Sequence, residues 1–405
     1  MNILIITPVF PYPLNSGGAQ AQFNMIDKMR NKYSITLLYI QKSIKDNKKE
    51  KELQKIWPNV KIVSYKYSWQ LLTWPFLYNK AIRAFKILFF EKNKHFIIER
   101  ALKPYGVFYT DKLIRFVHKS IIKCAPDIIQ TEFYPCLHMV KFLPANIRKI
   151  FIHHEIRFIR NERQLKDIVL NKSESELYIK LKNKEIEELN LFDRVITLTD
   201  VDKKILLNNQ VSADIKVSPA AINSAIHSHT ATKNKLLLLG GYSHKPNVEG
   251  TDWFIHEIAK KLKANCEIHL VGIGWPLQKI NSYINETQKD IIYHGFQKDL
   301  YAIAKGSIMV IPILTGSGMR MKILEAAAMG LPFITTSVGV EGLNFANKES
   351  CLIADTPEQW LEAVENLLND ESLGKRLADK AQDIYIKYYS LEASVAIRER
   401  IYKFN

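Results

Sequence analysis

The chain has 405 residues, of which 57 are Lys or Arg and 41 are Asp or Glu, so its formal net charge is +16. Hydrophobic residues make up 47 % and charged residues 24 % of the chain. This is the composition of a globular protein, and it excludes a disordered, collagen-like or low-complexity chain. At roughly 150 residues per domain, the length predicts two or three domains with substantial cores.

The positive charge implies an acidic partner: nucleic acid, an anionic membrane surface or a phosphorylated substrate. Nucleic acid is disfavoured, because the basic residues are spread along the chain and no RNP-like, helix-turn-helix or zinc-finger pattern occurs. The four cysteines are far apart and form no CxxC or Cys/His cluster, so neither a disulfide scaffold nor a metal site is expected. A reducing compartment, the cytoplasm, is the simplest interpretation.

No targeting or membrane-spanning segment is expected. The N-terminus, MNILIITPVF, lacks a basic region and reaches Pro8 too early for a signal sequence. No apolar run approaches the roughly 18 residues that a membrane span requires.

The first half alternates apolar, strand-like runs with helical patterns. A loop rich in Pro, Asn, Ser and Gly follows the first run, and a helix is expected near 19–30. This alternation favours a parallel sheet covered on both faces. The expected strands are Ile3–Thr7, Ser34–Ile40, Val60–Ser64, Ile128–Thr131, Ile150–His153, Val195–Leu198 and Ile215–Val217.

A second alternation begins after the polar stretch 223–234. Helices are expected at 250–263, 276–286, 300–304 and 319–329, and from Pro357 onward. The expected strands are Lys235–Leu239, Ile268–Val271, Ile291–His294, Ile308–Ile311 and Pro332–Thr335.

These two arrays predict an α/β protein with two doubly wound domains facing each other across a cleft, and ligands in such sheets bind beyond the carboxyl ends of the strands. We expect an N-terminal domain over residues 1–225 and a C-terminal domain over 233–385. The last helix, about Leu391 to Tyr402 within the segment 386–405, is expected to pack back on the first domain.

Two charged regions interrupt the first array. Residues 155–190 read as one long, charged helical region. Tyr65–Lys123 mixes aromatic and basic side chains, which fits either helices packed on the sheet or an interfacial surface that contacts an anionic membrane. Its aromatic residues include Trp69, Trp74, Phe76, Tyr78, Phe85, Phe89, Phe90 and Phe96.

The most informative segment is Gly316–Leu343, GSGMRMKILEAAAMGLPFITTSVGVEGL. A Gly-Ser-Gly turn leads into a helix, and turn amides with a helix N-terminus form an anion site. Arg320 and Lys322 are expected in the first turn, where cations oppose the helix dipole unless an anion is bound. Glu325 lies farther along the helix and can accept hydrogen bonds from sugar hydroxyls. The segment therefore indicates a phosphate or diphosphate site.

This segment resembles the donor-binding signature of the GT-B glycosyltransferases, particularly retaining family 4. The flanking sequences 293–313 and 352–370 resemble it too. The resemblance covers 235–389 well and the N-terminal half more loosely. It implies a GT-B fold of two Rossmann-like domains, in which residues 1–225 bind the acceptor and residues 233–385 bind the nucleotide-sugar donor. It also implies a retaining transferase that moves a sugar from a nucleotide-diphosphate sugar to a hydroxyl of a lipid-linked or glycan acceptor, in surface polysaccharide synthesis.

The resemblance also implies site residues. Glu325 would hold the nucleotide ribose, as the second Glu of an E-x7-E pair whose first position is here Ser317. His154, after the strand 150–153, would contact the reacting sugar, with Glu155 as its neighbour and His153 less directly involved. Arg320 and Lys322 would face the diphosphate. The remaining donor contacts would be Gly17, Gly18, Gly241, Lys245, Gly316, Ser317, Gly318 and Met319; Lys245 is equally well explained as a solvated lysine.

No cofactor or metal is expected beyond the donor substrate. The expected partners are a nucleotide sugar, a glycan or lipid-linked acceptor and an anionic membrane surface, so the chain would be cytoplasmic and peripheral on the inner face of the plasma membrane. Three alternatives stay open: another GT-B enzyme such as a nucleotide-sugar epimerase, an inactive sugar-binding scaffold, because Ser317 replaces a family Glu, and a nucleic-acid-binding protein.

Overall fold

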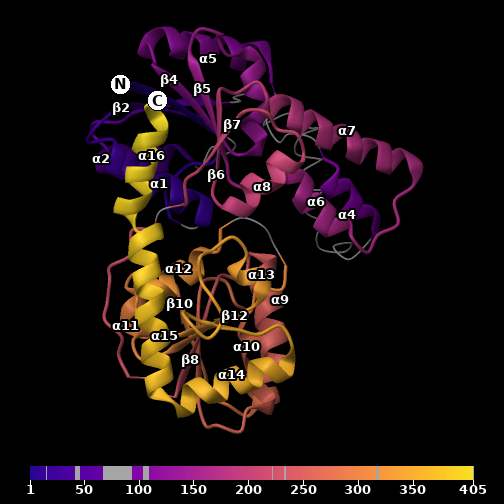
Figure 1. The fold of residues 1–405 in the computed structure, drawn as a ribbon, viewed down its shortest axis with the longest axis vertical. Helices are drawn as coiled ribbons and strands as arrows, with labels where there is room; N and C mark the ends of the chain where they lie inside the picture. The colour runs from indigo at the N-terminus through magenta and orange to yellow at the C-terminus, as the bar shows by residue number, and fades with distance from the viewer. Residues whose placement is uncertain are drawn as a thin grey trace. The chain divides into compact units, whose positions relative to one another are not determined.

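The computed structural model describes residues 1–14, 16–41, 46–66, 94–103, 109–220, 222–231, 234–315 and 319–404. The chain folds into two compact units: unit 1 is Met1–Ala220 with Ile397–Asn405, and unit 2 is Ala221–Ala396 (Figure 1). The segment 386–396 thus groups with unit 2 rather than with the first domain.

Unit 1 contains a sheet of seven parallel strands in the order β3-β2-β1-β4-β5-β6-β7. Each strand is an apolar run whose side chains are mostly buried, as expected of a parallel sheet with two covered faces. The strands are β1 (Asn2–Thr7), β2 (Ser34–Gln41), β3 (Lys61–Lys66), β4 (Ile128–Glu132), β5 (Arg148–His153), β6 (Arg194–Thr197) and β7 (Asp214–Val217).

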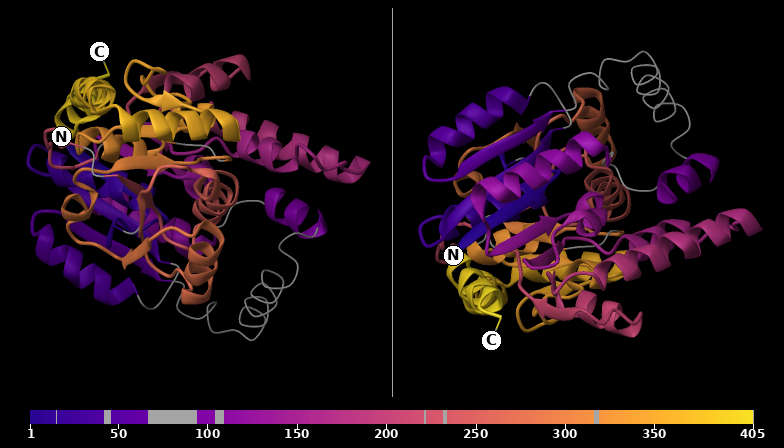
Figure 2. Two further views of the ribbon diagram at one scale, coloured as in Figure 1. Left: turned by 90° about the horizontal axis from the view of Figure 1, so that it is seen from below. Right: turned by 90° about the horizontal axis from the view of Figure 1, so that it is seen from above.

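Helices connect these strands, and one of them, α7, extends beyond the sheet as a long rod (Figure 2). The helices are α1 (Gly17–Met29), α2 (Asp46–Ile56), α4 (Lys94–Ala101), α5 (Asp111–Cys124), the 3-10 helix η1 (Tyr134–Phe142), α6 (Arg157–Leu165), α7 (Lys172–Leu189) and α8 (Asp200–Asn208).

The prediction of one helical region over 155–190 was wrong in detail. The structure has two helices, α6 and α7, separated by residues 166–171. Asn171 starts the second helix with a capping box. Its side-chain oxygen accepts a hydrogen bond from the backbone N–H of Glu174, and the Glu174 carboxylate accepts one from the backbone N–H of Asn171. A capping box of this kind fixes a helix start inside an otherwise helical sequence.

Unit 2 contains a sheet of six strands in the order β10-β9-β8-β11-β12-β13, again with parallel pairing throughout. Both sheets are doubly wound α/β structures, which confirms the predicted fold class. The strands are β8 (Lys235–Leu239), β9 (Glu267–Val271), β10 (Ile291–Gly295), β11 (Ile308–Ile311), β12 (Phe333–Thr335) and β13 (Leu352–Ile353), the last of which was not predicted.

The described part of unit 2 has two hydrophobic clusters, and one of them contains Trp360, which is fully buried and packs edge-on against Trp253 and Phe254. The helix expected at 250–263 is divided among α9, a π-helical turn and a 3-10 turn. The helices are α9 (Lys245–Trp253), η2 (Phe254–Ile258), η3 (Ala259–Lys261), α10 (Leu277–Thr287), α11 (Leu300–Ala304), α12 (Met321–Ala328), α13 (Ser337–Val340), α14 (Pro357–Asn369), α15 (Glu371–Ile384) and η4 (Tyr385–Tyr389).

The last helix, α16 (Leu391–Tyr402), has the bounds that the sequence predicts. Its C-terminal part is held in unit 1 by hydrogen bonds from Arg398 to Ser218 and from Arg194 to the carbonyl of Ile401. Beyond the helix, the guanidinium groups of Arg148 and Arg194 lie 4.5 and 4.2 Å from the centre of the Phe404 ring. These cation–π contacts anchor the end of the chain to the sheet.

Within the part of the chain that the structure describes, no helix is long and apolar enough to cross a membrane. Most of the aromatic and basic segment 65–123 lies outside the described residues, including all of its tryptophans. The described part of that segment consists of the end of β3, α4 and α5.

Candidate functional site

Two groups of polar residues lie at the carboxyl ends of strands, one in each unit. We call Gly240, Asn247 and Lys322 the Lys322 cluster, and Gln130, Glu132, His154 and Tyr402 the Glu132 cluster. In the sheet of unit 1, the chain continues from β1 to β2 on one side and from β4 to β5 on the other. In the sheet of unit 2, it continues from β8 to β9 on one side and from β11 to β12 on the other. That switch point is where doubly wound sheets bind ligands.

In unit 2, the loops after β8 and β9 approach each other closely. Gly240 and Gly272 have φ angles of +150° and +144°, and a Cβ on Gly272 would lie 2.3 Å from the carbonyl oxygen of Gly240. The indole of Trp275 donates a hydrogen bond of 2.8 Å to that same oxygen. Only glycine tolerates this backbone contact and these angles, so the sequence Gly240–Gly241 shapes the turn.

Lys322 lies in the first turn of α12 and points to the Gly240 turn. Its ammonium donates to the side-chain oxygen of Asn247 at 2.8 Å, and a Cβ on Gly240 would lie 2.9 Å from Nζ. Asn247 in turn donates to the carbonyl of Gly241 at 3.0 Å. The hydrogen bond to Asn247 thus holds the ammonium over the backbone of Gly240, where no side chain intervenes.

Desolvation lowers the pKa of Lys322 to about 8, while the negative charge of Glu325, three residues along α12, acts in the opposite direction. A cation in the first turn of a helix is also disfavoured by the helix dipole. Both effects make a bound anion favourable at this position.

The other residues predicted around α12 differ in their surroundings. Arg320 is 7 % exposed, donates to the carbonyl of Val338 at 3.1 Å and lies 3.8 Å from Glu341. Met319 packs against the core of unit 2. Gly316, Ser317 and Gly318 lie outside the described residues. Lys245 begins α9 and pairs with Glu249 at 3.6 Å, as a surface i,i+4 pair.

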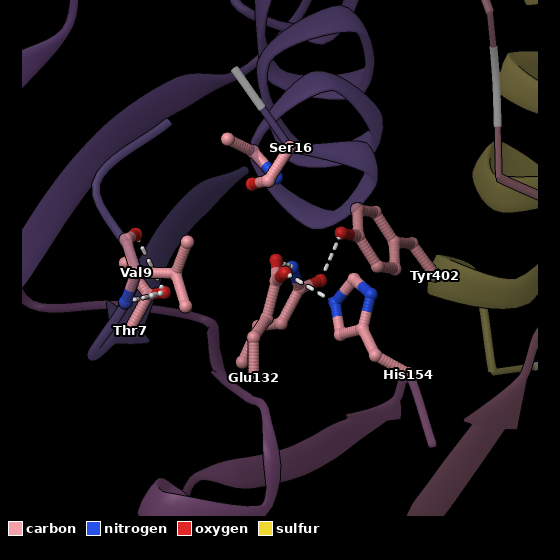
Figure 3. Close-up of polar contacts among 8 residues, drawn as sticks. Thr7, Val9, Ser16, Glu132, His154 and Tyr402 are labelled. Carbon is pink, nitrogen blue, oxygen red and sulfur yellow. Dashed lines mark hydrogen bonds and ion pairs between the residues drawn. The ribbon is translucent and has the colours of Figure 1, made fainter. Parts of the chain in front are cut away.

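In unit 1, Glu132 ends β4 and is only 4 % exposed. Its carboxylate accepts hydrogen bonds from Gln130 at 2.5 Å and from Nε2 of His154 at 3.0 Å. Burial opposes ionisation of Glu132, but the hydrogen bonds from His154 and Gln130 and the charge of Arg398 outweigh it and hold the pKa of the carboxyl below its ordinary value. Figure 3 shows Glu132, His154 and Tyr402 pointing toward one another.

The imidazole of His154 stacks on the ring of Phe133, with the ring centres 3.9 Å apart and the planes 5° from parallel. Phe133 has φ +65° and ψ 143°, a backbone conformation that non-glycine residues rarely adopt and that costs of order 1–3 kcal/mol. A Cβ on Gly18 would lie 2.9 Å from this ring. Gly18 therefore allows the first turn of α1, which Ser16 caps, to approach Phe133 and the Glu132 cluster.

His153 and Glu155 do not share the position of His154. His153 points away and lies 3.3 Å from the buried Glu185, because neighbouring strand residues face opposite sides. Glu155 pairs with Arg160 at 2.7 Å. The hydrogen-bond partner of His154 is Glu132, which sequence reasoning missed. The available signal was the pair Gln130 and Glu132 at the end of one strand, beside the strand that ends in His153.

A small cavity lies beside the Glu132 cluster, between the sheet, α1 and α16. Its volume of about 20 Å³ is enough for one water molecule. Gln22, Arg398 and Tyr402 contribute polar atoms to its wall. Among the described residues, no group of three His, Cys, Asp or Glu side chains could hold a metal ion, and none of the four cysteines forms a disulfide.

Comparisons with known proteins agree with this architecture. Residues 233–370 match the family model described as Glycosyl transferases group 1. A Klebsiella pneumoniae protein, described as an uncharacterized 44.6 kDa protein in the cps region, is 26 % identical over 155 residues. That match spans 36 % of this chain and 40 % of the relative, less than half of either.

Solved structures resemble the chain over its whole length. TarM has a TM-score of 0.68 at 14 % identity, with 99 % of this chain and 98 % of TarM covered. Sucrose-phosphate synthase of Thermosynechococcus elongatus has a TM-score of 0.66 at 13 % identity, with 99 % and 98 % covered. Anabaena HepE, solved with UDP and glucose, has a TM-score of 0.64 at 10 % identity, with 100 % of both chains covered. The chain therefore has the GT-B fold, and the similarity to the glycosyl transferases group 1 model lies in unit 2, over residues 233–370.

Proposed function

We propose that the chain is a glycosyltransferase that moves a sugar from a nucleotide-diphosphate sugar to a hydroxyl of a glycan or lipid-linked acceptor, with retention of configuration. The match to the glycosyl transferases group 1 model supports the reaction class. The cps-region relative supports a role in bacterial surface polysaccharide synthesis. HepE, solved in complex with UDP-glucose, makes a uridine diphosphate the first donor nucleotide to test.

The observation that carries this proposal is the environment of Lys322. Lys322 is a half-buried residue with a lowered pKa, and its ammonium lies over a glycine turn at the carboxyl ends of β8 and β9. A desolvated cation is stabilised by a bound anion, and the diphosphate of a nucleotide sugar gains negative charge as it leaves. Lys322 would stabilise that charge, with Arg320 adding a second cation.

The remaining roles follow from the chemistry of each side chain. Glu325, on the same helix as Lys322, would accept the ribose hydroxyls of the nucleotide. His154 would hydrogen-bond the transferred sugar. Its Nε2 is bonded to Glu132 and its ring plane is fixed by stacking on Phe133, so the imidazole is held in one orientation. A ring held at its edge and on one face needs little reorganisation when substrate binds.

The decisive experiment is a thermal-shift panel of UDP, GDP, ADP and the matching nucleosides. A ligand at 100 times its Kd stabilises the folded protein by about 2.7 kcal/mol. We expect one nucleoside diphosphate to raise the Tm and its nucleoside to do so much less. Lys322→Met should remove most of that difference, whereas the surface variant Lys375→Met should not. Equal shifts for nucleoside and diphosphate would contradict the role of Lys322.

Turnover then separates the alternatives. Sugar transfer to an added glycan or lipid-linked acceptor supports the proposal. Release of nucleotide with a changed free sugar would indicate an epimerase. Binding of a nucleotide sugar without any turnover would indicate a sugar-binding scaffold.

A further inference from the structure

The Glu132 cluster is a chain of hydrogen bonds that begins on the last helix. The Tyr402 hydroxyl donates to Oε1 of Gln130, Nε2 of Gln130 donates to Glu132, and the other oxygen of Glu132 accepts from His154. Gln130 and Glu132 point to the same side of β4 because they are two residues apart. Gln130, Glu132 and Tyr402 are 2 %, 4 % and 3 % exposed, so water does not compete for these contacts.

The direction of donation along this chain is fixed by chemistry. An ionised carboxylate only accepts hydrogen bonds, so Gln130 must present its NH₂ group and His154 its Nε2–H. The amide oxygen of Gln130 then faces Tyr402, whose hydroxyl must donate. If the Gln130 amide were flipped, its oxygen would face the carboxylate of Glu132. The Tyr402 hydroxyl opposes this flip, because it donates a hydrogen bond to the amide oxygen and holds that oxygen toward Tyr402.

The end of α16 is rigidly held where it supplies Tyr402. Arg398, one helical turn before Tyr402, is 4 % exposed and donates to Ser218 at 3.1 Å. The charge of Arg398 also favours ionised Glu132. The titratable or charged groups around Glu132 are His154, which follows β5, and Arg398 and Tyr402, which both lie on α16.

We propose that Tyr402 and Gln130 are positioning residues, which orient Glu132 and thereby keep the proton of neutral His154 on Nε2 and its Nδ1 unprotonated. The proposal rests on the proposed role of His154 in sugar binding. It gives the C-terminal helix a part in the reaction: Tyr402 acts on the imidazole through two intervening side chains, without contacting substrate.

The test compares Tyr402→Phe and Gln130→Met with wild type. Tyr385→Phe is the matched control, because Tyr385 is 1 % exposed and its hydroxyl donates to the carbonyl of Ile222, far from the Glu132 cluster in sequence. Nitrogen-15 NMR of histidine-labelled protein, assigned with His154→Gln, reports which imidazole nitrogen carries the proton. This readout needs no enzymatic activity, so it distinguishes failure of the present proposal from failure of the proposed function.

We expect wild type and Tyr385→Phe to show His154 protonated on Nε2, and both cluster variants to show a mixture of the two tautomers. Once transfer is measured, Tyr402→Phe should lower kcat by about 2- to 13-fold, the loss that one neutral hydrogen bond of 0.5–1.5 kcal/mol allows, with little change in donor KM. The acid limb of the pH profile should move to higher pH, because the ionised form of Glu132 is less well stabilised when Gln130 is no longer held in place. The double variant should lose no more than Gln130→Met alone. Unchanged His154 nitrogen shifts in folded Tyr402→Phe would overturn the proposal.

Discussion

Replacing Lys322 with Met should stabilise the unliganded protein and weaken its binding of a nucleoside diphosphate. Methionine keeps the unbranched shape of the side chain but removes the charge. In the folded protein, desolvation lowers the pKa of Lys322 from its ordinary value of 10.5 to about 8. Folding therefore works against the charged form of this residue.

The difference between those pKa values corresponds to about 3 kcal/mol at 1.36 kcal/mol per unit. This is an upper bound, because part of the side chain is exposed and Met loses the hydrogen bond to Asn247. We expect a gain of about 1 kcal/mol at pH 7. Between pH 8 and 10.5 the unfolded chain binds the lysine proton more strongly than the folded chain does, so this residue makes wild-type stability rise with pH in that window. The advantage of Lys322→Met should therefore disappear by pH 10.5.

The measurement is urea unfolding of wild type, Lys322→Met and Lys375→Met at pH 7 and pH 10. Lys375 is exposed and pairs with Asp379 four residues on, so its variant should stay within about 0.5 kcal/mol of wild type. Calorimetry of nucleoside diphosphate binding at pH 8, in buffers of different ionisation enthalpy, should show proton uptake by wild type that the Met variant lacks. The reasoning is refuted if Lys322→Met is less stable than wild type at pH 7 and the difference is the same at pH 10.

Four further predictions concern both units. Gly240→Ala should displace Lys322 and Asn247 and reduce diphosphate affinity, since its Cβ would lie 2.6 Å from the Asn247 side chain; unchanged affinity by calorimetry would contradict the close contact. Gln22→Leu should raise the free energy of unfolding by about 1–2 kcal/mol, because this 2 % exposed amide has no hydrogen-bond partner among the described residues; a urea midpoint below wild type would show that the amide is satisfied. Glu325→Gln should weaken nucleoside diphosphate binding by about 1.5–3 kcal/mol with little effect on Tm, and equal affinity would remove it from the ribose site. The chain should sediment with anionic vesicles at low salt and dissociate at high salt, each basic residue near the surface contributing about 1 kcal/mol, and failure to sediment would reject membrane association.

The strands could be predicted from the sequence because each is a short apolar run between turn residues. Ile3–Thr7 and Lys235–Leu239, for example, are buried central strands in the structure, as expected from their patterns. The two-residue strand β13 was missed, since Leu352–Ile353 is too short to show any periodicity. The break between α6 and α7 was missed because the charged composition continues through it, and only the spacing of Asn171 and Glu174 marks the new helix start.

The candidate site was less predictable, because its contacts join residues far apart in sequence. His154 was singled out by its place after a strand, but its partner Glu132 lies 22 residues earlier, and the link to Tyr402 spans 272 residues from Gln130. No local pattern encodes such pairings. By contrast, the conflict between Lys322 and the helix dipole is local, so the sequence alone indicated an anion site at α12.

Several features that lower stability lie in or beside these two clusters. Phe133 adopts a strained backbone next to Glu132, and Gln22 buries an amide in the wall of the cavity beside the Glu132 cluster. Lys322 loses hydration in the first turn of α12. A sequence selected only for stability would remove each of them with a single substitution. They lie close to the residues proposed to bind sugar and phosphate, and departures from local rules of this kind are expected at functional positions. We therefore infer that the strain and the desolvation preorganise a binding site. We therefore expect Lys322→Met and Gln22→Leu each to gain stability and to lose ligand binding or turnover, so the two variants are informative together.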